Sequence, residues 1–288
     1  MGTTTAPDPQ QEGLAAYLDG LAKAAGHADR TVPLKDYCTG LLLPGERKSM
    51  EPMAARLAPD HVSRMHQSLH HFVADAPWSD EVLLAEVRSR VLAVMQRQGP
   101  VVAWIVDDTG FPKKGSHSAG VARQYCGQLG KQDYCRVAVS LSVASANASL
   151  PIAYRLYLPE LWANDEQRRR KAGVPERIEL RTKPQIAAAQ IRQAVEDDLP
   201  RGVVLADAGY GNDGQFRAAL TELKLRCVVG VQSSMSVWAP GTEPLPAKPW
   251  SGRGRPPKLL YRDDQHKPVS MKQLAQSLPS SAWKNVTW

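Results

Sequence analysis

The chain has 288 residues, of which 43% are hydrophobic and 23% are charged, and these values are typical of a soluble globular protein of about two domains. They disfavour collagen-like, coiled-coil and wholly disordered chains. No apolar run approaches the ~20 residues of a membrane-spanning helix, and the polar N-terminus lacks a secretory signal, so we expect a cytoplasmic protein. The four cysteines form no C-x-x-C pair, which predicts reduced thiols.

The charge balance points to a polyanionic partner. Thirty-six basic and twenty-nine acidic residues give a formal net charge of +7. A positive surface attracts nucleic acids, but many basic proteins of this size bind none. The motifs must therefore decide whether DNA or RNA is the partner.

Residues 1–98 are predicted to form a small helical domain. Leu18 and Leu21 belong to a series of apolar residues at helical spacing, and a second series lies between residues 82 and 92. Proline and glycine residues separate the helical stretches. Ser79 or Asp80 is placed to cap the helix that follows it.

The pattern changes to strands after residue 98. The apolar run 101–106 is typical of a strand covered on both faces, and it is expected to end at Asp107 and Asp108. Alternating apolar residues over 135–143 and again over 152–158 predict an antiparallel hairpin.

Strands joined through helices follow. A helix is expected to begin near Pro184, a strand covers 203–206, a helix covers 212–223 and a last strand covers 226–231. The expected order is β-β-β-α-β-α-β, an α/β arrangement that resembles the mixed sheet of the ribonuclease-H-like fold. We therefore expect this core over residues 99–232, followed by an incomplete β-rich insertion over 233–288.

Acidic residues stand at the ends of two of these strands. The first strand leads into Asp107 and Asp108, and the fourth leads into Asp207. These two strands are neighbours at the centre of such a sheet, so their carboxylates are expected to converge. Converged carboxylates suit a hard divalent cation, Mg²⁺ or Mn²⁺, which would assist displacement at the phosphorus of a phosphodiester. Taken singly, each aspartate fits an ordinary turn or capping residue better than a ligand, but taken together with the strand order the three favour a metal site.

Several long segments are similar to the DDE transposases of bacterial insertion sequences. The segments that carry the likeness are residues 41–49, 107–115, 120–131, 168–175 and 205–211. The resemblance implies a catalytic set of two aspartates and one glutamate that binds Mg²⁺ or Mn²⁺. It also implies cleavage at the terminal inverted repeats of the element, strand transfer into target DNA, and a homodimer in a synaptic complex.

The resemblance places the two aspartates. Asp207 matches the second aspartate of the family. The usual Asp-x-Thr arrangement selects Asp107 as the first aspartate, because Thr109 follows two residues later, and Asp108 is the adjacent alternative. One residue step along a strand turns the side chain to the other face, so only one of the two is expected to bind metal directly. Asp107 is the favoured ligand.

The third acid has no matching stretch in this sequence. Glu222 and Glu243 both lack the helical context of the family glutamate, and the residues from 280 to 288 read as the opening of an unpaired strand. A C-terminally truncated transposase with impaired catalysis is therefore expected. Two alternatives remain open: a non-catalytic, DNA-binding remnant that acts as an inhibitor or an inert fragment, and a nuclease without strand transfer that uses Glu222.

Basic residues supply candidate DNA contacts. One pair follows the first aspartates, one run lies in the polar connection, and one group lies in a segment that resembles an AT-hook, although short basic segments are often only mobile linkers or solvated loops. The helical region 1–98 is a further candidate for DNA binding or dimerisation. The individual candidates are Lys113, Lys114, Arg168, Arg169, Arg170, Arg253, Arg255 and Lys258.

Overall fold

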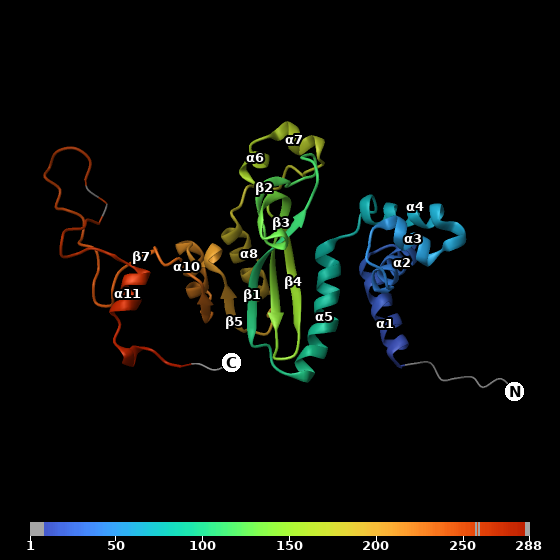
Figure 1. Ribbon diagram of the computed structural model, residues 1–288, viewed down its shortest axis with the longest axis horizontal. Coiled ribbons are helices and arrows are strands. Elements are labelled where there is room, and N and C mark those ends of the chain that lie inside the picture. Colours follow the sequence, from blue (N-terminus) through green and yellow to red (C-terminus); the bar gives the residue numbers. More distant parts are fainter. Residues whose placement is uncertain (1–8, 257, 259, 286–288) are drawn as a thin grey trace. The chain divides into compact units, whose positions relative to one another are not determined.

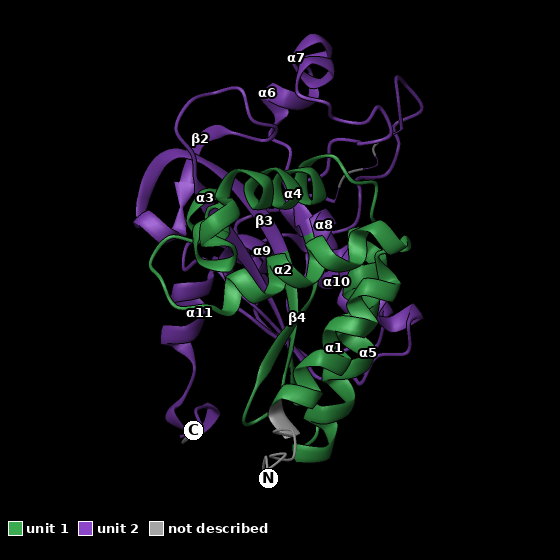
Figure 2. Cartoon of the chain, turned by 90° about the vertical axis from the view of Figure 1, so that its right-hand side faces the viewer, with its two compact units in different colours: residues 1–103, 140–154 green, residues 104–139, 155–288 purple. Residues whose placement is uncertain are grey.

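The computed structural model describes residues 9–256, 258 and 260–285, so Pro257 of the basic segment and the predicted strand opening beyond residue 285 lie outside the described residues. The chain forms two compact units (Figure 2). One contains residues 1–103 and 140–154, and the other contains residues 104–139 and 155–288. Within the described ranges, no helix has both the length and the apolar character needed to cross a membrane.

The first unit begins with the predicted helical region (Figure 1). Short 3₁₀ turns at Ala28–Arg30 and Pro59–His61 precede two of its helices. The helices are α1 (Pro9–Ala24), α2 (Thr31–Leu42), α3 (Met50–Leu57), α4 (Val62–Ala74) and α5 (Asp80–Gln98).

These helices bury part of the apolar series that the sequence predicts, although Val82 at the start of α5 is exposed. Leu18 and Leu21 of α1 pack with Phe72 of α4, and the Phe72 ring stacks on Trp78 at a centroid distance of 5.8 Å. The Ser79 hydroxyl oxygen accepts from the backbone N–H of Val82 at 3.3 Å. Ser79 thus caps α5 as predicted, satisfying one of the donors that the first turn leaves unpaired.

A six-stranded sheet follows in the chain. Its order is β2-β3-β1-β5-β6, with β4 also paired to β3. β2 and β3 are antiparallel whereas β5 and β6 are parallel, so the sheet is mixed. The strands are β1 (Ala103–Pro112), β2 (Ala122–Cys126), β3 (Lys131–Ala144), β4 (Ser149–Leu156), β5 (Val203–Ala206) and β6 (Cys227–Val229).

Helices alternate with the later strands. α8 begins with a capping box in which Thr182 and Gln185 bond each other's backbone N–H groups, and Pro184 occupies its first turn, where the missing N–H costs nothing. The helices of this part are α6 (Glu160–Ala163), α7 (Glu166–Lys171), α8 (Lys183–Glu196), α9 (Ala208–Gly211) and α10 (Gly214–Glu222). This mixed α/β architecture is compatible with the ribonuclease-H-like fold.

Two details differ from the sequence-based expectation. β1 runs through Asp107 and Asp108 to Pro112 instead of ending at the aspartates, because β3 lies alongside and the Tyr134 carbonyl still accepts from Lys113 N–H at 3.0 Å. The expected strand order is also incomplete, since β2 lies between the first and second predicted strands. The two-residue strands β7 (Ser236–Val237) and β8 (Val269–Ser270) pair farther on, before α11 (Met271–Ser277) and a 3₁₀ turn at Ser280–Ala282.

Candidate active site

Three aspartates line one cavity of about 440 Å³ in the second unit. Asp107 and Asp108 lie on β1, Asp207 directly follows β5, and these strands are neighbours in the sheet. The structure thus brings together the three acids that the sequence singles out. The other residues that line the cavity are Thr109, Gly110, Tyr125, Gly127, Gln128 and Val137.

Asp207 stands at the junction between β5 and α9. Its Oδ1 accepts from the backbone N–H of Gly209 at 2.8 Å, so the carboxylate caps the short helix. A carboxylate at a helix start also benefits from the positive end of the peptide dipoles. This capping holds Asp207 in place beside the end of the strand.

Asp107 and Asp108 are adjacent on β1 but have different surroundings. Oδ1 of Asp107, an exposed residue, accepts from the Asp108 N–H at 2.7 Å. Asp108 is half-buried: its Oδ2 accepts from Lys183 Nζ at 2.5 Å, and its Oδ1 accepts from the Tyr210 hydroxyl. Both oxygens of Asp108 are therefore engaged by side chains from α8 and α9.

The pKa of the Tyr210 hydroxyl is raised by its burial and by the nearby aspartates. Burial is the largest cause of the rise in its pKa, and the hydrogen bond to Asp108 is the next. The negative charges of Asp108, Asp207 and Asp107 raise the pKa of Tyr210 further, because each disfavours a nearby phenolate. All three carboxylates thus lie close enough to act on one buried hydroxyl.

The donors of this cavity fit a hard divalent cation. Mg²⁺ prefers oxygen ligands and is commonly bound through one or two carboxylates while it keeps several waters. Asp107 and Asp207 offer such a pair from adjacent strands, whereas Asp108 is already bound by an ammonium group. Across the part of the chain that the structure describes, no cluster of three or more His, Cys, Asp or Glu side chains has the spacing of a metal site. Asp107 and Asp207 are therefore two candidate ligands, fewer than such a cluster would supply.

Neither glutamate considered from the sequence lines this cavity. Glu222 lies at the end of α10 and forms an ion pair with Arg192 of α8 at 3.7 Å. Glu243 is exposed in the turn-rich segment that follows β7. The described acids of the cavity are all aspartates.

The predicted basic contacts near the site differ in their surroundings. Lys113 and Lys114 are exposed just beyond the end of β1. Arg168 instead lies 3.9 Å above the Trp162 ring and donates to the Ser116 carbonyl at 2.7 Å, and Arg169 donates to backbone carbonyls that include Ile178 at 2.6 Å. These two arginines hold loops together, and contact with DNA stays a prediction for them. Arg170 pairs with Glu166 at 3.4 Å.

The AT-hook-like segment is bent. Gly252 and Gly254 have φ of 81° and 71°, values in the left-handed region that glycine tolerates, so the core is not extended as expected. The Gly254 carbonyl accepts from the Trp250 indole at 3.1 Å, and this bond closes the turn. Arg253, Arg255 and Lys258 are exposed around it.

Sequence reasoning missed Lys183, Tyr210 and Tyr125. Tyr210 lies in the segment after Asp207, and its spacing of three residues places it one helical turn on, which is a signal that could have been used. Lys183 directly precedes the expected helix start, but nothing local indicates that its partner is Asp108, 75 residues away.

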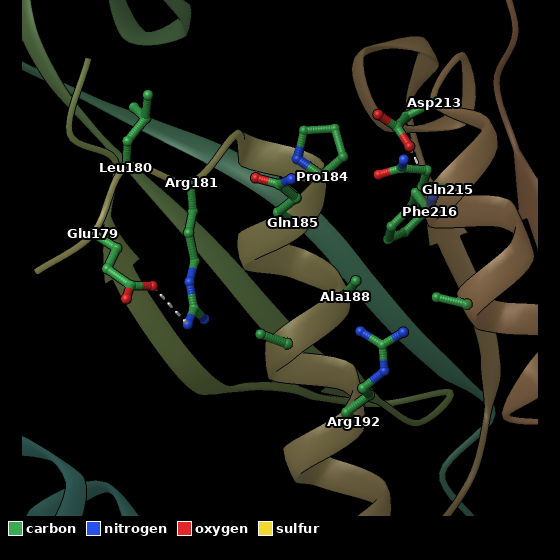
Figure 3. Close-up of a pocket in the computed structure, with 12 residues that line it drawn as sticks. Glu179, Leu180, Arg181, Pro184, Gln185, Ala188, Arg192, Asp213, Gln215 and Phe216 are labelled. Atoms are coloured by element: carbon green, nitrogen blue, oxygen red, sulfur yellow. Dashed lines mark hydrogen bonds and ion pairs between the residues drawn. The ribbon is translucent and has the colours of Figure 1, made fainter. Parts of the chain in front are cut away.

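A second cavity of about 420 Å³ lies between α8 and α10 (Figure 3). Arg181 and Arg192 are among its lining residues, and each is paired with a glutamate, Arg181 with Glu179 at 3.8 Å and Arg192 with Glu222. Its lining includes none of the three aspartates described above. Because both arginines already have acidic partners, this cavity offers no evident chemistry.

Comparison with known proteins gives concordant results. The family model described as DDE superfamily endonuclease matches residues 18–288. A probable transposase for insertion sequence element IS701 from Microchaete diplosiphon is 34% identical over 190 residues, which are 66% of this chain and 46% of that protein. The chain thus spans about half the length of this curated relative.

Proposed function

This chain belongs to the DDE superfamily of endonucleases, and from that premise we propose that it is a DNA transposase that cuts at the ends of an insertion sequence and joins them to target DNA in the bacterial cytoplasm. The observation that carries the proposal is the convergence of Asp107, Asp108 and Asp207 on one cavity between neighbouring strands. The likeness to an insertion-sequence transposase supports DNA as the substrate.

We assign the metal-binding role to Asp107 and Asp207. When bound there, Mg²⁺ or Mn²⁺ would activate the attacking oxygen and stabilise the departing oxygen of the phosphodiester. Asp207 is fixed by its capping bond to Gly209, and Asp107 accepts from the N–H of its neighbour, so both carboxylates are oriented before any ion arrives. Asp108 is assigned a supporting role in the same cavity, because Lys183 neutralises its charge and Tyr210 orients its carboxylate.

Phosphate contacts are proposed for the exposed cations near the cavity and in the basic segment. Lys113 and Lys114 follow the strand that carries Asp107 and are exposed, so they are candidates for contact with the phosphates of a bound DNA strand. Arg253, Arg255 and Lys258 are exposed on the bent segment, which would extend when it enters a minor groove. Such contacts raise affinity without reading sequence, and they weaken as salt concentration rises.

A second copy of the chain is proposed as the partner at the other end of the element, since two ends have to be held while they are joined. The helical region 1–98 is a proposed DNA-binding or dimerisation domain, residues 99–232 the catalytic core, and residues 233–288 an inserted region.

The test is nicking of a DNA fragment that carries the ends of the insertion sequence encoding this chain. We expect Mg²⁺- or Mn²⁺-dependent cleavage, and we expect Asp107→Asn and Asp207→Asn each to lower its rate by about 100-fold or more, because each removes a charged oxygen ligand. A second measurement needs no cleavage: added Mg²⁺ should raise the melting temperature of the wild type and not that of either variant.

Asp264→Asn is the matched control. Its carboxylate is 95% exposed and pairs with Lys267 outside the cavity, so cleavage and the Mg²⁺ response should both be retained. Cleavage that survives both Asp107→Asn and Asp207→Asn would overturn the assignment. Tight binding of the ends without cleavage would favour a non-catalytic binding protein, and cleavage that ignores the end sequence would favour a nuclease.

A further inference from the structure

The β2–β3 hairpin has one face that packs and one face that is exposed. In its antiparallel register, Arg123 stands opposite Tyr134 and Tyr125 stands opposite Gln132. Residues that are opposite one another, or two apart on a strand, share a face of the sheet. Arg123, Tyr125, Gln132 and Tyr134 therefore form one surface, called the hairpin face below, and all four are exposed.

The other face of the hairpin carries its buried residues, although Lys131 is exposed on it. Ala122, Cys126 and Cys135 are buried there, and Gln124 bonds the Cys135 carbonyl through Nε2 at 3.0 Å. Because this side is fixed, the hairpin cannot turn its exposed tyrosines inward without losing that packing. The hairpin face is thus a preformed surface and not a mobile loop.

The hairpin face combines aromatic area with positive charge. The Tyr125 and Tyr134 residues are 61% and 49% exposed, although a tyrosine normally hides much of its ring. Residues 122–136 contain three basic residues and one acid, and that acid, Asp133, is paired with Lys131 at 3.3 Å. Arg123 also helps to lower the pKa of Asp133, but its side chain is exposed opposite Tyr134, where an anionic ligand can reach it.

The hairpin face adjoins the aspartate cavity. Tyr125 is itself one of the residues that line the cavity, together with Gly127 and Gln128 of the connection between β2 and β3. On the far side, the Tyr134 carbonyl accepts from Lys113 N–H, which brings the exposed lysines after β1 next to the hairpin. A strand of DNA that leaves the cavity in this direction meets aromatic rings and cations.

We propose that the hairpin face binds an unpaired stretch of DNA beside the cleavage point, with bases stacked on Tyr125 and Tyr134 and a phosphate near Arg123. This inference rests on the proposed function. Bases within a duplex are already stacked on their neighbours, whereas unpaired bases gain by stacking on an exposed aromatic ring. Exposed aromatic rings beside a cation are common elements of a surface that binds single strands.

The test compares two DNA probes in the absence of cleavage, with Ca²⁺ as the metal. One probe is a duplex, and the other is the same duplex with a short single-stranded extension that carries a fluorescent adenine analogue. Tyr125→Ala and Tyr134→Ala should each weaken binding of the extended probe by about 5- to 150-fold, the value of one stacked base, and leave binding of the blunt duplex unchanged. Stacking in the wild type should quench the analogue.

Tyr125→Phe and Tyr134→Phe keep the ring and should keep both affinity and quenching, which separates stacking from hydroxyl contacts. Tyr154→Ala is the matched control, because Tyr154 is a strand tyrosine with a similar exposure of 46%. Wild-type affinity for the extended probe in both alanine variants would overturn the inference, as would equal loss in the phenylalanine variants. If the wild type nicks DNA but either of these contrary outcomes is observed, only the inference about the hairpin face fails. If the wild type binds neither probe, both the inference and the proposed function fail.

Discussion

The Lys183 ammonium donates to Oδ2 of Asp108 at 2.5 Å and so joins the first turn of α8 to the middle of β1 across 75 residues of chain. The same ammonium lies 5.6 Å from the centre of the Tyr157 ring, within the range of a cation–π contact. One of the three carboxylates in the cavity is therefore balanced by a cation. The cavity carries less negative charge than its aspartates alone suggest, which lowers the cost of bringing them together.

Tyr210→Phe tests the other bond to Asp108. The Tyr210 ring is buried and its hydroxyl donates to the Asp108 carboxylate. We therefore expect the substitution to lower the free energy of unfolding by about 1 to 2 kcal/mol. This value is at the low end for a hydrogen bond to a charged group, because the Asp108 side chain is partly exposed. The raised pKa of Tyr210 means that this contribution is full below its ordinary value of 10.0 and is lost as pH rises through the folded value. Urea unfolding at pH 8 and above pH 10 measures both effects. Equal stability of the two proteins at pH 8 would contradict the prediction.

Gly211→Ala tests the close approach of α9 to β6. A Cβ at residue 211 would lie 1.9 Å from the Gly230 carbonyl oxygen, so the backbone must shift, and we expect a loss of about 3 kcal/mol or more in stability. Gly214→Ala is the control, because the nearest atom to its Cβ is 3.8 Å away, and alanine there should be neutral or stabilising by up to about 1 kcal/mol. Thermal melting distinguishes them, and similar melting temperatures would show that the junction adapts.

Arg169→Ala tests the loop that follows α7. The Arg169 guanidinium donates to the carbonyls of Pro175, Glu176 and Ile178, so its loss should free this segment. We expect trypsin to cleave after Arg177 or Arg181 about tenfold faster, because opening of the loop loses these bonds. Trypsin should cleave the Arg170→Ala variant after the same two residues at the wild-type rate. The Arg170 side chain is exposed, and it pairs with the exposed carboxylate of Glu166. Unchanged cleavage of Arg169→Ala would show that other contacts hold the loop.

Thiol labelling at pH 8 tests the cysteine environments. Cys227 is exposed and should react rapidly with a disulfide reagent. Burial and the neighbouring Cys126 raise the pKa of Cys135 to about 11, so its reactive thiolate is scarce, and burial also raises the pKa of Cys38. Cys227→Ser should therefore remove the fast phase of thiol labelling. The three remaining thiols should react slowly, or only after the protein is denatured. A fast phase that persists in Cys227→Ser would be the contrary result.

The parts of the fold that were predictable are those that local patterns determine. The run 203–206 is a short apolar stretch that ends in Asp207, and both the strand and the position of the acid agree with the structure. Ser79 caps α5 for an equally local reason, a hydroxyl placed before a helical series. Convergence of the aspartates followed from strand order, which is a rule of topology and not of any single residue.

The parts that were missed depend on contacts between distant residues. β2 is five residues long, and its exposed face holds Arg123 and Tyr125, so the apolar signal is too weak to be recognised. Tyr210 meets Asp108 across 102 residues. The run of Arg168 to Arg170 resembles a solvated basic patch, yet two of its guanidinium groups bond backbone carbonyls, a use that composition cannot reveal.

Gly110 sets how near the hairpin comes to the strand of aspartates. A Cβ at this position would lie 3.0 Å from the Cys126 sulfur and 3.2 Å from the Cys126 Cα, so even a methyl group would push β2 outward. Gly110 and Tyr125 both line the aspartate cavity, so the width of the cavity depends on the absence of a side chain at residue 110. Substitutions at residue 110 would therefore alter the distance between the carboxylates and the Tyr125 ring, and with it the size of ligand that the cavity admits.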